Sequence, residues 1–133
     1  MIFIDSNIPM CLIGAAHPHK TEAQVILERL IAGGQRLVTD VEVLQEVLHR
    51  YTAINRREAI GPGLRVTLDI VDDVIPIEKA EVLRAAEIVQ NPALMSARDA
   101  VHIAVMERHG IQSILSFDSD FDRWPGLRRI HRI

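Results

Sequence analysis

The stretch Met1-Ile2-Phe3-Ile4-Asp5-Ser6-Asn7 opens the chain with an apolar run that ends in an acid and two further polar residues. A short, continuous apolar run bounded by polar turn residues is typical of a strand buried in a parallel sheet. In an open α/β sheet, ligands bind outside the carboxyl ends of the strands. The stretch therefore predicts a buried first strand that delivers Asp5 to a cleft.

The same pattern returns near the other end of the chain, where the apolar run from Ile111 to Phe117 is followed by Asp118. Further strands are predicted at 37–38, 74–77 and 127–130. Helical patterns follow Ser6, run from Thr21 to Gly33, follow Asp40, and cover 64–71, 78–90 and 97–109, whereas 55–63 is polar and punctuated by glycine. This alternation predicts an α/β fold: one domain over 1–133 with a mostly parallel, twisted sheet and helices on both faces.

We expect Asp40 to cap the start of a helix. This helix carries an apolar stripe with acids on its other side. The stripe has the spacing i, i+3, i+4 and i+7 and consists of Leu44, Val47, Leu48 and Tyr51. We expect this stripe to face the core. Glu42 and Glu46 share the opposite face, and the pattern does not choose between them for a functional role.

The composition narrows the class of protein. A chain of 133 residues can bury a core without help from disulfides or structural metals. The single Cys11 cannot form an internal disulfide, which fits a reducing compartment. No apolar run approaches the roughly 18 to 20 residues of a membrane span, and no signal-peptide pattern opens the chain. We therefore expect a soluble, cytoplasmic protein with no membrane contact.

The charge distribution bears on nucleic-acid binding more than the net charge of −3 does. Phosphate binding favours Arg and Lys, and the segment 123–132 holds four arginines and no acid. Arg128 and Arg129 in this tail, and Arg98, are candidates for RNA phosphate contacts. Heavy use of arginine also fits a genome-wide preference for that residue, and a solvated helix surface explains Arg98 equally well.

Four widely separated acids stand where an apolar segment ends or a helix presents a polar side: Asp5, Glu46, Asp99 and Asp118. Carboxylates gathered in one cleft repel one another unless a cation neutralises them. Mg²⁺ and Mn²⁺ prefer such hard oxygen ligands. The four acids therefore indicate a divalent-metal site, and metal-assisted chemistry is the function this pattern favours.

Each acid also has a plainer local explanation. Asp5 stands where it could cap the helix that follows it. Asp99 completes Ser96-Ala97-Arg98-Asp99, a capping-box pattern, and Asp118 begins an alternating run with Asp120 and Asp122 that is typical of turns. For each of these positions, the local sequence alone does not decide between a metal-binding role and a capping or turn role.

Four segments, in order, resemble the signature of the PIN domain: Ile2 to Asn7, Leu44 to Leu48, Arg98 to Ala100 with Ile103-Ala104, and Leu115 to Phe121. At this length the chain is similar to the VapC-type toxins of toxin–antitoxin pairs. The resemblance implies an endoribonuclease that depends on Mg²⁺ or Mn²⁺, acts on RNA, forms a homodimer and is inhibited by a cognate antitoxin protein. The rival readings are a phosphotransfer or receiver domain and a catalytically silent PIN-like module that binds RNA or a partner.

Matched residue by residue, the resemblance implies specific roles. The catalytic acids are Asp5, Glu46, Asp99 and Asp118, with Asp5, Asp99 and Asp118 as metal ligands and Asn7, Ser116 and Asp120 as supporting groups. Ser116 stands where the family usually has threonine, and the hydroxyl is kept. Whether Asp118 or Asp120 touches metal first, and whether one metal or two act, stays open. The six histidines show no metal-ligand spacing, and we expect surface or packing roles for them.

Overall fold

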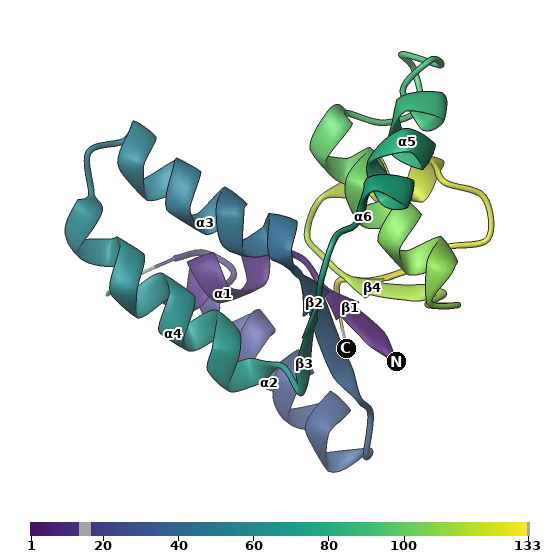
Figure 1. Cartoon of the computed structure of the whole chain (residues 1–133). Coiled ribbons are helices and arrows are strands. Elements are labelled where there is room, and N and C mark those ends of the chain that lie inside the picture. Colours follow the sequence, from purple (N-terminus) through teal and green to yellow (C-terminus); the bar gives the residue numbers. More distant parts are fainter. Residues whose placement is uncertain (14–16, 133) are drawn as a thin grey trace.

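Five short strands form one parallel sheet in the order β3–β2–β1–β4–β5 in the computed structural model, which describes residues 1–13 and 17–132 (Figure 1). The strands are β1 (Ile2–Ile4), β2 (Leu37–Asp40), β3 (Asp73–Ile75), β4 (Ser113–Leu115) and β5 (Arg128–Ile130). Every pair of neighbours is parallel, and the wholly buried β1 lies in the middle between β2 and β4. The predicted α/β class is confirmed, and the opening run forms a buried strand, as predicted.

Helices cover both faces of this sheet, as predicted. Within the described ranges they are α1 (Asn7–Leu12), α2 (Lys20–Ala32), α3 (Val41–Ala53), α4 (Ile60–Ile70), α5 (Lys79–Ile88) and α6 (Ala97–Arg108), with 3-10 turns η1 (Arg57–Ala59) and η2 (Ser119–Arg123). Alternate residues of a strand point to opposite faces. Phe3 accordingly packs in the core beneath α5 and α6, while Ile2 and Ile4 pack against α1 and α2.

The segment expected to be irregular, 55–63, is mostly helical. It contains η1, and α4 begins at Ile60, so Pro62 falls in the first turn, where a missing N–H costs no helical hydrogen bond. Gly63 is required by packing: a Cβ at this position would lie 2.9 Å from Val47 Cγ1 and 3.1 Å from Tyr51 Cε2. α4 therefore lies closely against α3, the pair that extends to the left in Figure 1.

The buried face of α3 also differs from the prediction. Leu48 is 46% exposed, whereas Val43, Glu46 and Val47 are buried. The stripe of Leu44, Val47, Leu48 and Tyr51 is therefore only partly a core face, because α3 turns its Glu46 side toward α6, where the glutamate finds a charged partner. Among the described residues, no helix has the length and apolar character needed to cross a membrane.

Candidate active site

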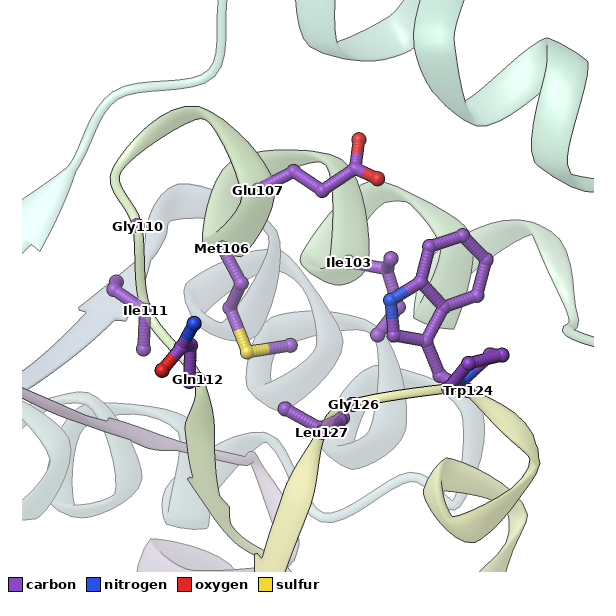
Figure 2. A pocket seen from close by; sticks show the side chains of 10 residues that line it. Ile103, Met106, Glu107, Gly110, Ile111, Gln112, Trp124, Gly126 and Leu127 are labelled. Atoms are coloured by element: carbon purple, nitrogen blue, oxygen red, sulfur yellow. The ribbon is translucent and has the colours of Figure 1, made fainter.

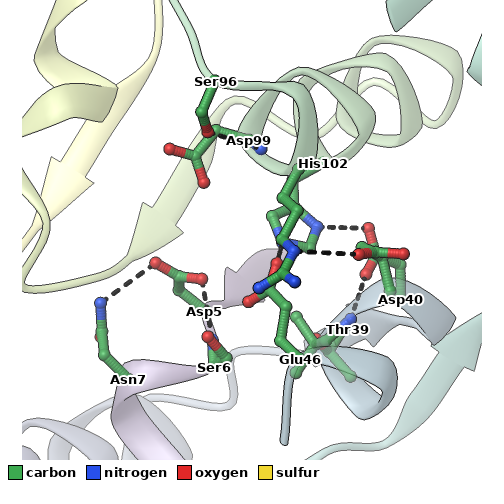
Figure 3. Close-up of polar contacts among 12 residues, drawn as sticks. Asp5, Ser6, Asn7, Thr39, Asp40, Glu46, Ser96, Asp99 and His102 are labelled. Atoms are coloured by element: carbon green, nitrogen blue, oxygen red, sulfur yellow. Dashed lines mark hydrogen bonds and ion pairs between the residues drawn. The ribbon is translucent and has the colours of Figure 1, made fainter. Parts of the chain in front are cut away.

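Acidic side chains gather at the carboxyl end of the sheet, and they come from elements far apart in the sequence. Asp5 directly follows β1, Glu46 lies in the second turn of α3, Asp99 in the first turn of α6, and Asp118 between β4 and η2. Asp5 and Asp118 are near enough to Asp99 for their negative charges to help raise its pKa. Figure 3 shows Asp5 and Asp99 near each other, with His102 and Glu46 beside them. The structure thus brings together the four acids singled out in the sequence.

Asp5 is enclosed by hydrogen-bond donors. Its Oδ1 accepts from the Ser6 backbone N–H at 2.8 Å, and its Oδ2 accepts from Ser116 Oγ at 2.6 Å and Asn7 Nδ2 at 3.1 Å. Ser116 Oγ in turn accepts from the Asp118 backbone N–H at 3.0 Å. Burial raises the pKa of Asp5, while these hydrogen bonds and the charge of His102 act against that rise. Asn7 and Ser116 therefore lie where supporting groups were expected.

Glu46 is held by a histidine that the sequence did not single out. His102 Nε2 lies 2.6 Å from Glu46 Oε1, and His102 Nδ1 lies 2.7 Å from Asp40 Oδ2. Burial alone would lower the pKa of His102, but the charges of Asp40 and Glu46 and their hydrogen bonds raise it well above its usual range. Burial alone would raise the pKa of Glu46, but the hydrogen bond and charge of His102 outweigh it and hold that pKa low.

Asp99, Asp118 and Asp120 form the more open part of the cluster. One carboxylate oxygen from each lies within 4.8 Å of the others, and all three side chains are half-buried. Burial, followed by the charge of Asp5 and then that of Asp118, raises the pKa of Asp99 to about 6. The Ser96 side chain accepts from the Asp99 backbone N–H at 3.4 Å, so Ser96 caps α6 while the Asp99 carboxylate belongs to the cluster.

The donor set fits a hard divalent cation. All of these ligand atoms are carboxylate oxygens, which Mg²⁺-like ions prefer. Burial and the neighbouring acids disfavour the charged form of Asp99, which raises its pKa, and a bound cation would favour that charged form. His102 is grouped with Asp5 and Glu46 by distance, but both of its nitrogens already face carboxylates. The acidic cluster can therefore hold a divalent cation through oxygen ligands alone.

The three arginines suggested for phosphate binding lie in different settings. Arg98 is exposed, with Nε 3.9 Å from Glu42 Oε1. Arg128 is exposed on β5 and donates from Nε to Ser113 Oγ at 3.3 Å. Arg129 forms a two-pronged pair with Asp122, at 2.8 and 3.0 Å, and also donates to the Ser116 carbonyl. The donors of Arg129 are thus used for contacts within the protein, whereas Arg98 is exposed to solvent beside the acids.

Two of the cavities outside the cluster bear on residues considered above. One of about 360 Å³ is formed by the end of α6 and the loop carrying Trp124, and its lining contains Met106 and Leu127 but none of the four acids (Figure 2). Trp124 is half-buried there against the core. The other, of about 340 Å³, touches the acidic site through Asn7 and is lined by Arg50, Tyr51, His19 and Phe117.

Sequence reasoning missed His102 and the second role of Asp40. His102 lies three residues after Asp99, so both project from the same side of α6, and that spacing was the available signal. Asp40 was expected only as a helix cap. It does cap α3, accepting from the Val43 N–H at 3.0 Å through Oδ1, and uses Oδ2 for His102.

Comparisons with known proteins agree with this geometry. A family model described as the PIN domain matches residues 2–127. Ribonuclease VapC13 of Mycobacterium tuberculosis is 54% identical over 130 residues, which cover 98% of this chain and 99% of the relative. The crystal structure of M. tuberculosis VapC20, described as a sarcin-ricin loop cleaving toxin, has a TM-score of 0.74 at 25% identity and covers 92% of this chain and 93% of its own. A VapBC2 structure from Rickettsia felis, bound to a promoter DNA fragment, has the same fold, with a TM-score of 0.74, 18% identity and 98% of each chain covered.

Proposed function

Because the chain belongs to the PIN domain family, we propose that it is a metal-dependent endoribonuclease and the toxin of a toxin–antitoxin pair. The observation that carries this proposal is the acidic cluster at the carboxyl end of the sheet, with Asp99, whose pKa is raised to about 6, at its open side. A relative with 54% identity along nearly the whole chain is named a ribonuclease, which supports RNA as the substrate. The nuclease unit is the single domain formed by residues 1–133.

Asp5, Asp99 and Asp118 would hold Mg²⁺ or Mn²⁺, with Asp120 close enough to Asp99 to share this task. When bound, such an ion lowers the pKa of a coordinated water and offsets charge that develops on the scissile phosphate. Glu46, turned toward Asp5 from α3, orients the attacking water by accepting its hydrogen bond. Asn7 and Ser116 fix the Asp5 carboxylate through the hydrogen bonds at its Oδ2.

The RNA strand would pass from the acids over the cavity at Asn7. Unpaired bases bind by stacking on aromatic rings and arginine planes, and this cavity offers Tyr51, Phe117 and Arg50. His19 stacks on Phe117, with ring centroids 4.4 Å apart. Exposed Arg98, and more distantly Arg128, are available for phosphate contacts, whereas the pairing of Arg129 with Asp122 argues for a structural role.

Protein partners are part of the proposal. Solved structures with this fold include one titled a toxin–antitoxin complex from Klebsiella pneumoniae, with 19% identity and a TM-score of 0.68. The α3–α4 pair exposes the apolar side chains of Val41, Leu48 and Leu68. Burial of such side chains is favourable on association, which supports a cognate antitoxin and a homodimer as occupants of this side of the molecule. The enzyme would act in the cytoplasm, where its RNA substrate is found.

The test is cleavage of single-stranded RNA by the purified chain with Mg²⁺, with Mn²⁺ and with excess EDTA. Asp99→Asn, purified in the same way, controls for contaminating nucleases. We expect cleavage that requires the metal and is lost in the variant. Undiminished cleavage in EDTA would contradict the mechanism, and tight RNA binding without any cleavage would favour a silent binding module.

A further inference from the structure

His102 is held on three sides inside the protein. Its Nδ1 lies 2.7 Å from Asp40 Oδ2 and its Nε2 lies 2.6 Å from Glu46 Oε1. The Phe3 ring packs beside the imidazole, with centroids 5.2 Å apart. The side chain of His102 is fully buried, and Asp40 is fully buried with it. The ring therefore has one orientation, in which both nitrogens face carboxylate oxygens (Figure 3).

The Asp40 contact anchors the ring to the start of α3. Asp40 is the last residue of β2, and its other oxygen accepts from the Val43 N–H at 3.0 Å, which caps the helix. Glu46 projects from the next turn of the same helix. The contacts therefore run from Asp40, the N-cap of α3, to His102 on α6 and back to Glu46 in the second turn of α3.

This arrangement leaves His102 no free nitrogen for a metal ion or a substrate. A carboxylate oxygen accepts hydrogen bonds, so each ring nitrogen serves as the donor to its acid. His102 consequently acts on the reaction through Glu46. Without the ring, a glutamate side chain with three rotatable bonds would sample several orientations beside Asp5.

We propose that His102 is a positioning residue, which Asp40 anchors and which fixes the Glu46 carboxylate in the orientation needed for hydrolysis. The inference rests on the proposed ribonuclease function. It assigns His102 no contact with metal or RNA. Residues that orient a group at a metal site typically contribute about 10- to 100-fold to activity, which is the size of effect expected here.

Two substitutions separate positioning from simple support of the fold. In His102→Gln the amide nitrogen takes roughly the place of Nε2 and can still donate to Glu46, whereas in His102→Asn it takes roughly the place of Nδ1 and can donate only to Asp40. Both variants lose one buried contact. We expect kcat to fall by about 10- to 100-fold in His102→Asn and by less than about 10-fold in His102→Gln, with KM changed by less than about threefold in both.

The measurements are kcat and KM on single-stranded RNA at saturating Mg²⁺, together with the melting temperature of each variant. His49→Gln is the matched control, because it removes an exposed imidazole from the same helix as Glu46 and should leave all three quantities unchanged. If activity followed melting temperature across the two His102 variants, whichever contact was kept, the role would be structural and the proposal overturned.

A double-mutant cycle with Glu46→Gln tests whether His102 acts through Glu46. The fall in kcat caused by His102→Asn should largely disappear when Glu46 is already changed, because the group being positioned is absent. An equal fall in both backgrounds would overturn the proposal. These outcomes differ from failure of the proposed function, which would appear as wild-type protein that does not cut RNA in a metal-dependent way.

Discussion

The acidic site has an inner half and an outer half, and the carboxylates of the two halves differ in burial and in their hydrogen-bond and charged partners. In the inner half, formed by Asp5, Glu46 and His102, the acids are buried, and each accepts hydrogen bonds from neighbouring groups. In the outer half, formed by Asp99, Asp118 and Asp120, the carboxylates are partly exposed, and the pKa of Asp99 is raised to about 6 by burial and by its acidic neighbours. The inner half is thus fixed by hydrogen bonds and by the charge of His102, whereas in the outer half Asp120 pairs with Arg123 at 3.1 Å and Asp99 keeps a raised pKa.

This difference suggests separate roles for the carboxylates of the two halves. A buried acid with its own donors is fixed before any ligand arrives. An acid whose charged form is disfavoured gains from a nearby cation, so metal binding should stabilise the ionised form of Asp99.

The largest expected effect is the loss of activity when the outer half loses a charge. Asp99→Asn should reduce kcat by on the order of 10² or more, because the amide keeps the shape but removes the charge that would hold metal. Asp5→Asn should cost at least as much. The measurement is cleavage of a labelled RNA over a range of Mg²⁺ concentrations, and near-wild-type activity of either variant would place the reaction elsewhere.

The second-largest effect is expected in the stability of the metal-free protein, where substitutions in the two halves should differ. Repulsion alone would make Asp5→Asn neutral or stabilising, but its oxygens accept from Ser6, Asn7 and Ser116, and an amide NH₂ cannot accept. We therefore expect a cost of about 1 to 3 kcal/mol and a melting temperature several degrees lower.

Asp118→Asn is the contrasting variant from the outer half. Its side chain accepts from the Asp120 N–H at 2.9 Å, a bond that an amide oxygen can also accept. The melting temperature without metal should be unchanged or higher, and added Mg²⁺ should stabilise wild type more than this variant. Equal destabilisation by Asp5→Asn and Asp118→Asn would remove the distinction between the halves.

A smaller effect is expected in the pH dependence of stability. Folding raises the pKa of Asp99 from 3.8 to about 6, so the folded state binds this proton more tightly than the unfolded state does. The protonated Asp99 therefore contributes to stability below about pH 4, and this contribution is lost as pH rises from about 4 to about 6. The asparagine in Asp99→Asn does not titrate, so the stability of this variant shows no such decrease. After allowance for solvent screening, its advantage over wild type should grow by about 1 to 2 kcal/mol between pH 4 and pH 7.

The check is denaturant unfolding of both proteins in metal-free buffer at several pH values. A difference in unfolding free energy that stays constant across this range would show that folding does not raise the pKa of Asp99.

The smallest effect should come from Asp122, which the sequence places beside the site and the structure places outside it. Asp122 is exposed but pairs with Arg129, whose side chain is largely buried. Asp122→Asn should therefore change kcat by less than about twofold and, because the amide keeps one acceptor oxygen for Arg129, lower the melting temperature only slightly. A loss as large as that of Asp118→Asn would extend the outer half to a further acid.

The parts of the molecule that the sequence predicted well depend on local pattern. The apolar run before Asp5 identified a buried strand, and the capping patterns of Asp40 and of Ser96 placed the starts of α3 and α6. The ordered resemblance then selected the acids that the fold brings together. Their individual roles stay predictions until the variants are measured.

The parts that the sequence did not predict depend on distant contacts. His102 meets Glu46 and Asp40 across 56 and 62 residues of chain, so no local spacing identifies its partners. Periodicity defined a stripe on α3 but not the element that the stripe meets, and Leu48 therefore proved exposed while Glu46 proved buried. Gly61-Pro62-Gly63 suggested a loop, yet close packing of α4 on α3 requires the last of these glycines.

The position of β1 between β2 and β4 has a consequence for how such a nuclease is made. Asp5 and Ser116, which share a hydrogen bond, are separated by 111 residues, and Asp118 lies further on still. A chain emerging from the ribosome folds its amino-terminal parts first, but until β4 is released β1 lacks one neighbour and the acids lack Asp118. Chains that end before β4 therefore lack Ser116 and Asp118, so the acidic cluster can be completed only when synthesis is nearly finished.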